Sequence, residues 1–265
     1  MESSDATFLE RGSDSKMLMQ VGSARSNVLD RRVAFTLASV AGALNASAFY
    51  AVGFFSANMT GNVSTLSDHI ATGQWLSALF YSSVVIAFML GSIASTLLIN
   101  MGRRRNYRGI FALTILIEAV LMGCLGCVSF WLASPWGTSC FILGLAFLMG
   151  LQNAVVTRIS DARVRTTHVS GMATDIGIEL ALLFDSLRKR EPPGEIGNVQ
   201  ARLRLHVETI LSFLVGGIIG VLLYRMIGSA TLWIAATVLG VIALSALRRA
   251  RLDTSRAYPA SSNDL

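Results

Sequence analysis

The sequence predicts an all-α membrane protein of about six transmembrane helices, arranged as two inverted three-helix repeats. The first observation behind this prediction is the scarcity of charge: 14% of the residues are charged and 53% are hydrophobic. A soluble domain has about 25% charged residues. Between positions 33 and 102 the only charged residue is Asp68, and between 109 and 157 it is Glu118. Stretches this long and apolar need lipid around them.

Six segments have the length and composition of a membrane span, which needs about 20 apolar residues. They are residues 33–53, 78–99, 109–129, 138–156, 207–224 and 230–247. We therefore expect a single transmembrane domain at 31–251, with repeat one at about 31–130 and repeat two at about 138–248. Polar cytoplasmic tails are expected at 1–30, which should be disordered, and at 252–265.

The second observation is the distribution of Lys and Arg among the segments that join these spans. Of the 22 basic residues, 21 fall in alternate connectors and in the two tails, and only Arg225 falls on the other side. Basic residues mark the cytoplasmic side of a membrane protein. The pattern predicts six crossings of a bacterial inner membrane with both termini in the cytoplasm.

The third observation is a polar motif that occurs twice. Residues 42–46 (GALNA) precede 58–62 (NMTGN), and residues 150–154 (GLQNA) precede 167–171 (THVSG). Each copy begins inside the first span of a three-span unit and continues into the connector after it. Three spans separate equivalent points, and because this number is odd the second unit is inverted. Polar breaks at corresponding places of inverted repeats are typical of transporters. The apolar stretch 171–184 is too short to span and suits a re-entrant half-helix; an interfacial helix is the alternative.

These motifs, together with the longer run GLQNAVVTRISDARVRTTHVSGMATDIGIEL, resemble the YoaK family of bacterial transmembrane proteins. The similarity covers roughly 32–247. The resemblance implies a multispanning bacterial membrane protein, and it carries no assigned catalytic or binding residues. Ser170-Gly171-Met172 in the second motif stands where the first has Thr60-Gly61-Asn62, so strict two-fold ligand symmetry is not expected.

Three acidic residues are candidates for coupling to protons or cations. Asp175 and Glu179 are four residues apart and would share a helix face, and paired carboxylates in a low-dielectric site suit proton binding. The alternative is that both are solvated or paired to Arg163 and Arg165 at the interface. Glu118 falls near the middle of a span, where an ionised carboxylate is unfavourable. It is either a ligand or a protonated side chain bonded to a neighbouring helix.

The remaining candidates for solute binding are amides, hydroxyls, glycines and one histidine in the motifs. An amide within a span either binds a ligand or holds helices together, and a hydroxyl at a break also caps a helix. His168 is either a ligand of the site or a polar anchor beside the arginines. The segment from Arg165 to His168 suits a phosphate or carboxylate, although orientation alone explains the arginine. The set is Asn45, Asn58, Thr60, Gly61, Asn62, Gln152, Asn153, Thr167, His168, Ser170, Gly171 and Thr174.

The sequence favours a small-solute or ion transporter, with proton coupling as one option, and no catalytic residue is predicted. It contains no motif of a common enzyme class. The alternatives are a membrane accessory protein and a membrane-embedded enzyme acting on lipid. We expect no metal and no cofactor, because no His, Cys or acidic set has ligand spacing. The expected partners are the lipid bilayer and an unknown small solute or ion, without nucleic acid; self-association is left open.

Overall fold

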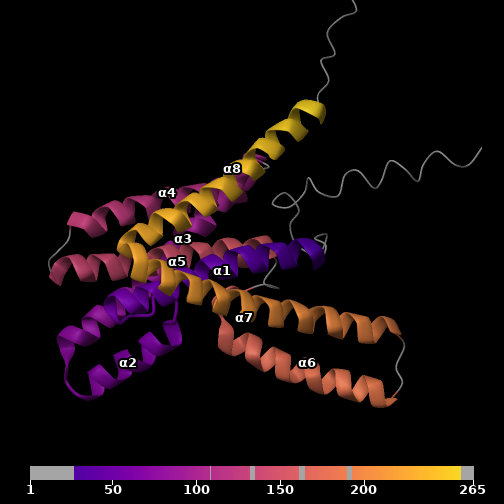
Figure 1. The fold of residues 1–265 in the computed structure, drawn as a ribbon, viewed down its shortest axis with the longest axis horizontal. Helices are drawn as coiled ribbons and strands as arrows, with labels where there is room; N and C mark the ends of the chain where they lie inside the picture. The colour runs from indigo at the N-terminus through magenta and orange to yellow at the C-terminus, as the bar shows by residue number, and fades with distance from the viewer. Residues whose placement is uncertain (1–26, 108, 132–134, 161–164, 190–192, 258–265) are drawn as a thin grey trace, which may run out of the picture.

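The computed structural model describes residues 27–107, 109–131, 135–160, 165–189 and 193–257, and every element there is helical (Figure 1). This confirms the all-α class for the part of the chain described. The elements are α1 (Asn27–Val52), α2 (Met59–Ala71), α3 (Trp75–Arg104), α4 (Ile110–Trp131), α5 (Pro135–Ser160), α6 (Val169–Lys189), α7 (Pro193–Ile227), the 3-10 turn η3 (Gly228–Ala230) and α8 (Thr231–Ala257).

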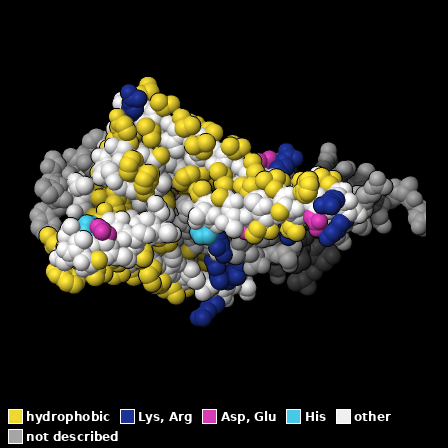
Figure 2. Space-filling model, turned by 90° about the horizontal axis from the view of Figure 1, so that it is seen from below, with side chains coloured by type: hydrophobic (Ala, Val, Ile, Leu, Met, Phe, Trp, Pro, Cys, Tyr) yellow, Lys and Arg dark blue, Asp and Glu magenta, His cyan; other side chains and the backbone are white. Residues whose placement is uncertain are grey.

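Five helical stretches are long and apolar enough to cross a membrane. They are Phe35–Val52, Trp75–Arg104, Ile110–Val128, Gly137–Ser160 and Ile196–Arg248. The last covers α7, η3 and α8 together. Large hydrophobic side chains such as Leu97, Ile218 and Val241 are exposed on these helices, and hydrophobic side chains cover much of the face seen in Figure 2. Apolar helices with apolar exposed faces are those of a membrane protein.

The two motif-bearing connectors contain helices of their own. At about 1.5 Å per residue, the 13 residues of α2 extend about 20 Å, too short for a span. Helix α6 has 21 residues and continues to Lys189, so it is longer than the expected half-helix at 171–184. Helices α1 and α8 extend a few residues into the segments expected as tails, because α1 begins at Asn27 and α8 continues to Ala257.

Glycines in the left-handed region end the first two helices. Gly53 (φ 70°) follows α1, and Gly73 (φ 72°) follows α2. The amide of Gly53 donates to the carbonyl of Phe49, and that of Gln74 to the carbonyl of His69. These bonds satisfy carbonyls that a helix end otherwise leaves free, and glycine adopts this φ without strain. The chain then reverses within Thr72–Gln74, so that α2 and α3 pack as a hairpin.

The helices pair across the two halves of the chain. The most extensive contacts are α1 with α7, α3 with α5, and α4 with α8. Figure 1 shows α1, α3 and α5 together in the centre of the molecule, α4 beside α8, and the hairpins α2–α3 and α6–α7 extending to opposite ends. The largest fully buried side chains, including Leu44, Ile115 and Met149, fill the space between the paired helices.

Glycines allow two of these pairs to approach backbone to backbone. A Cβ at Gly42 of α1 would overlap the carbonyl group of Phe213 in α7, and a Cβ at Gly150 of α5 would overlap that of Phe88 in α3. Gly42 and Gly150 are the first residues of the two motif copies. Small residues at such crossings are the usual means of close helix packing in membranes.

The partner helices α7 and α3 also contribute glycines to these two crossings. A Cβ at Gly216 of α7 would overlap the carbonyl group of Ser39, and a Cβ at Gly91 of α3 would overlap that of Phe147. Each of these two contacts between α1 and α7 therefore has a counterpart between α5 and α3. The counterparts are 108 residues apart between α1 and α5 and 125 residues apart between α3 and α7.

Candidate functional site

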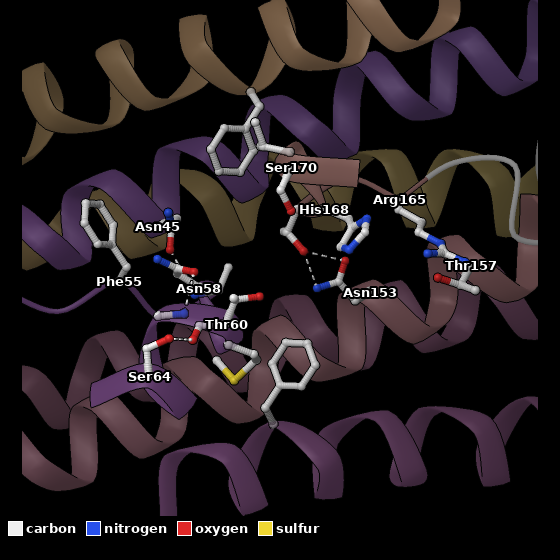
Figure 3. A pocket seen from close by; sticks show the side chains of 17 residues that line it. Asn45, Phe55, Asn58, Thr60, Ser64, Asn153, Thr157, Arg165, His168 and Ser170 are labelled. Carbon is white, nitrogen blue, oxygen red and sulfur yellow. Dashed lines mark hydrogen bonds between the residues drawn. The ribbon is translucent and has the colours of Figure 1, made fainter. Parts of the chain in front are cut away.

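A pocket of about 710 Å³ lies where the two motif copies meet. It is formed by the last part of α1, the segment before α2, the start of α2, and the corresponding parts of α5 and α6, with one phenylalanine each from α3 and α7. In Figure 3, Asn45, Asn58, Thr60 and Ser64 lie on one side of the pocket, and Asn153, His168, Ser170 and Arg165 lie on the other. Its lining residues are Asn45, Phe55, Ala57, Asn58, Met59, Thr60, Gly61, Ser64, Phe88, Asn153, Thr157, Arg165, Thr167, His168, Val169, Ser170 and Phe213.

On the first side, Asn45 fixes the segment that leads into α2. Its Oδ1 accepts a hydrogen bond from the Ala57 amide at 2.9 Å. The next residue, Asn58, caps α2: its Oδ1 accepts from the amide of Gly61 at 3.0 Å. Side-chain acceptors at this position satisfy amides that the first helical turn leaves free. Glycine fits at position 61 because a Cβ there would overlap the side-chain amide of Asn58.

On the second side, Asn153 plays the equivalent part. Its Nδ2 lies 2.6 Å from Thr167 Oγ1, and its Oδ1 lies 2.9 Å from the same hydroxyl. His168 directly precedes α6, and a Cβ at Gly171 would overlap its ring. The helix breaks in both motifs therefore come before Thr60 and Ser170, since these residues and the glycines beside them lie in the first turns of α2 and α6.

The structure brings about half of the predicted binding residues together in this pocket. Those that line it are Asn45, Asn58, Thr60, Gly61, Asn153, Thr167, His168 and Ser170. Those that do not are Asn62, Glu118, Gln152, Gly171, Thr174, Asp175 and Glu179. The Asn62 side chain is buried against Met59, and the Thr174 hydroxyl donates to the Ser170 carbonyl within α6.

The candidate coupling acids lie apart from the lining. Glu118 of α4 is fully buried, and neither carboxyl oxygen has a hydrogen-bond partner in the described part of the chain. Gln152 of α5 is buried in the same unpartnered way, next to the pocket residue Asn153. A buried polar group without a partner is unfavourable. The hydroxyls of Ser56 and Ser95 are unpartnered in the same way, but Glu118 is the only acid among these side chains in the described part of the chain.

Asp175 and Glu179 do not form a pair of carboxylates. Asp175 is exposed on α6, whereas Glu179 is buried against α7. A carboxylate oxygen of Glu179 lies 3.1 Å from His206 Nδ1, and the other lies 3.9 Å from Arg202 Nε. The partners proposed from the sequence were Arg163, which lies outside the described residues, and Arg165, which lines the pocket instead.

Several lining residues escaped the sequence analysis. Phe88 of α3 and Phe213 of α7 are far from either motif in the sequence. They line the pocket because their backbones pack directly against Gly150 and Gly42 of the motifs. The two phenylalanines are 125 residues apart, whereas the two motif copies are 108 and 110 residues apart. Because the spacings differ, the phenylalanines were not recognised in the sequence as part of the same repeat. Among the described residues, no three His, Cys, Asp or Glu side chains are grouped as a metal site.

Comparison with known proteins places the chain among membrane proteins. The family model described as "Protein of unknown function (DUF1275)" matches residues 33–245. The UPF0700 transmembrane protein YoaK of Bacillus subtilis (strain 168) is 25% identical over 119 residues, which cover 44% of this chain and 52% of that protein. The matched region thus spans about half the length of the curated relative. No solved structure matches.

Proposed function

The chain belongs to the DUF1275 family of membrane proteins, and we propose that it is a small-solute transporter whose binding site is the pocket between α2 and α6. The observation that carries this proposal is the repetition of the pocket's two sides. Asn45 and Asn153, 108 residues apart, hold residues 57 and 167, which are 110 apart. Phe88 and Phe213 face the pocket from counterpart positions of α3 and α7.

These relations support an inverted repeat. Helix α1 packs on α7 and helix α5 packs on α3, so exchanging the halves of the chain exchanges the two interfaces. If α1, α3, α4, α5, α7 and α8 are the six spans, each half holds three of them and the second half is inverted. Helices α2 and α6 then begin near the midplane and run toward opposite faces of the membrane, as Figure 1 suggests by their directions.

A pocket on the two-fold axis of an inverted repeat is the typical solute site of a secondary transporter. In such a protein, rocking of one half against the other opens the pocket to one side at a time. By the positive-inside rule, α2 would approach from outside and α6 from the cytoplasm. Glu118, Asp175 and Glu179 remain the candidates for proton coupling; because none of them lines the pocket, coupling would have to act through the helices rather than by direct contact with solute.

Cysteine labelling tests this proposal. Cys124, Cys127 and Cys140 are free and exposed, so they are first replaced by alanine. Thr60→Cys and Ser170→Cys, which sit at counterpart positions of the pocket, are then treated with a membrane-impermeant thiol reagent in right-side-out and inside-out vesicles. A transporter should expose each cysteine to both sides in separate experiments, because the pocket alternates.

The alternatives predict different labelling. In a static accessory protein each cysteine should react from one side only, at a rate that no solute changes. An exposed control at Asp68→Cys should react from a single side in either case, since Asp68 is exposed on α2 away from the pocket. One-sided labelling of both pocket cysteines would contradict the transporter proposal.

A further inference from the structure

The lining of the pocket is rich in hydrogen-bond donors. No Asp or Glu is among its described lining residues, although it holds the guanidinium of Arg165 and the ring of His168. We propose that this pocket binds an organic anion, a carboxylate or phosphate ester with an apolar body. The inference deepens the proposed function, on which its role in transport rests, but binding itself is measured separately.

Two helices begin at the pocket. The amide of Gly61 donates a hydrogen bond to the side-chain Oδ1 of Asn58, and the amide of Asn62 donates to the backbone carbonyl of Asn58. The amide of Thr60 in α2 and the amide of Ser170 in α6 donate to no group in the described part of the chain. Free amides and the positive end of the helix dipole favour an anion at a helix N-terminus. Here two such ends approach the same space from opposite sides (Figure 3).

The side chain of Asn45 adds an independent observation. This residue is only 8% exposed and lines the pocket. Its Oδ1 is occupied by the Ala57 amide, which fixes the orientation of the side chain. Its Nδ2 makes no hydrogen bond within the described residues, and it is not among the atoms sealed from solvent. A nearly buried side chain thus presents an unused N–H donor, rather than its acceptor, to the pocket.

Arg165 provides the charge. Its side chain is exposed and forms no ion pair within the described part of the chain. The two acids of α6 considered from the sequence do not pair with it: Glu179 contacts His206 and Arg202, and Asp175 does not line the pocket. A guanidinium matches carboxylate and phosphate oxygens with two parallel hydrogen bonds. Among the described residues, the pocket therefore has a positive charge and no acidic counter-ion in its lining.

The size and the remaining lining indicate an organic ligand rather than a bare ion. The volume of about 710 Å³ lies in the range of small-molecule sites, about 300–1,000 Å³. Phe55, Phe88 and Phe213 provide aromatic surface around it, and Phe55 stacks on Phe49 with ring centroids 4.0 Å apart. Aromatic walls with convergent polar donors suit a ligand with an apolar body and one anionic head.

The test compares probes that differ in charge but share one ring. Protein in phosphatidylcholine nanodiscs is titrated with benzoate, phenyl phosphate, the neutral benzamide and the cationic benzamidine at constant ionic strength, and binding is measured by calorimetry and thermal shift. We expect at least one anion to bind about tenfold more tightly than benzamide, because hydrogen bonds to charged groups are the stronger ones. Benzamidine should not bind.

Variants locate the site. Asn45→Asp keeps the acceptor for the Ala57 amide but replaces the free donor by a negative charge, and Arg165→Gln removes the guanidinium. Each should weaken the anion about tenfold or more, whereas Arg104→Gln, which removes an exposed charge at the end of α3, should not change it. Because Arg165 is exposed, its variant remains informative even if the Asn45 variant fails to fold.

The outcomes separate the two proposals. Anion binding lost in Arg165→Gln, together with one-sided labelling of the pocket cysteines, would keep the anion site and remove the transporter. Equal affinity for benzamide and both anions, or tighter binding of benzamidine, would overturn the anion site whatever the labelling shows. Probe binding that is present in phosphatidylcholine and lost when phosphatidylglycerol replaces it would indicate that an anionic lipid headgroup occupies the pocket, and would overturn the proposal of a soluble anion.

Discussion

The hydroxyl of Thr167 lies 2.6 Å from Nδ2 and 2.9 Å from Oδ1 of Asn153, and so ties the segment before α6 to helix α5. The two residues are 14 positions apart, and the chain between them crosses residues 161–164, which lie outside the described part. The counterpart bond, from the Ala57 amide to Asn45, uses the backbone instead of a side chain. The second side of the pocket should therefore be the more easily altered by mutation.

A double-mutant cycle measures this bond. Asn153→Ala and Thr167→Val should each lower the free energy of unfolding by about 1 kcal/mol, the usual net value of a hydrogen bond. Because both remove the same interaction, the double mutant should lose less than the sum. The measurement is thermal denaturation in detergent micelles. Thr157→Val, also in the pocket lining, serves as the control, and a coupling with Asn153 as large as that of Thr167 would contradict the assignment.

The glycine crossings give a second prediction. Gly42→Ala and Gly150→Ala should each destabilise the protein by about 1–3 kcal/mol, because the added methyl overlaps a backbone carbonyl that cannot move without separating the helices. Gly177→Ala is the matched control: it lies within α6 with nothing within 4 Å of its Cβ position. There alanine should raise stability by about 0.5–1 kcal/mol.

Unfolding midpoints in detergent test the crossings directly. Equal midpoints for Gly42→Ala and Gly177→Ala would mean that α1 and α7 are not in backbone contact. If only one of Gly42 and Gly150 were sensitive, the two crossings would not be counterparts, and the support for an inverted repeat would weaken.

The sequence was sufficient for the helical class, the membrane assignment and the family, because long uncharged stretches have few other stable environments. Both motifs that it singled out contribute residues to one pocket. The exact position of the helix breaks was less clear, because Thr60-Gly61 and Ser170-Gly171 belong to the first turns of α2 and α6 and the breaks precede them. The glycines there leave room for the side chains of Asn58 and His168. From the sequence alone, a glycine that leaves room for a neighbouring side chain cannot be told from a glycine that adopts an unusual backbone angle.

Contacts between distant helices were beyond sequence reasoning. The spacing of Asp175 and Glu179 predicts a shared face of α6, yet Glu179 packs on α7 while Asp175 is exposed. Nothing in a local pattern shows that residue 206 will lie beside residue 179. The repeat does contain a trace of it: His69 and Tyr81, the counterparts by shifts of 110 and 125 residues, also contact each other, with ring centroids 5.3 Å apart.

The Glu179–His206 contact predicts that a single variant will be less stable than the corresponding double variant. His206→Leu should be strongly destabilising, by about 3 kcal/mol, because it leaves a carboxylate that is only 7% exposed with the distant Arg202 as partner. The double variant Glu179→Leu/His206→Leu should recover most of that loss, since a buried polar pair is often replaceable by apolar residues. Unfolding in detergent gives the comparison. A double variant less stable than His206→Leu would show that the pair itself is needed.

Glu118 gives the last prediction. Its carboxylate is fully buried in α4 without a partner among the described residues, and an ionised acid at the centre of a span is unfavourable by about 2.5–3.5 kcal/mol on insertion scales. Glu118→Gln keeps the shape and removes the charge, so it should insert and unfold like the unmodified chain or be more stable, whereas Glu118→Lys should fail to accumulate in the membrane. Asp175→Asn, at an exposed position, should leave stability unchanged.

A large loss of stability in Glu118→Gln would show that the carboxylate has a structural partner. If Glu118→Gln is stable and anion uptake no longer responds to a proton gradient, Glu118 is a coupling residue; if uptake responds as before, coupling does not involve this side chain.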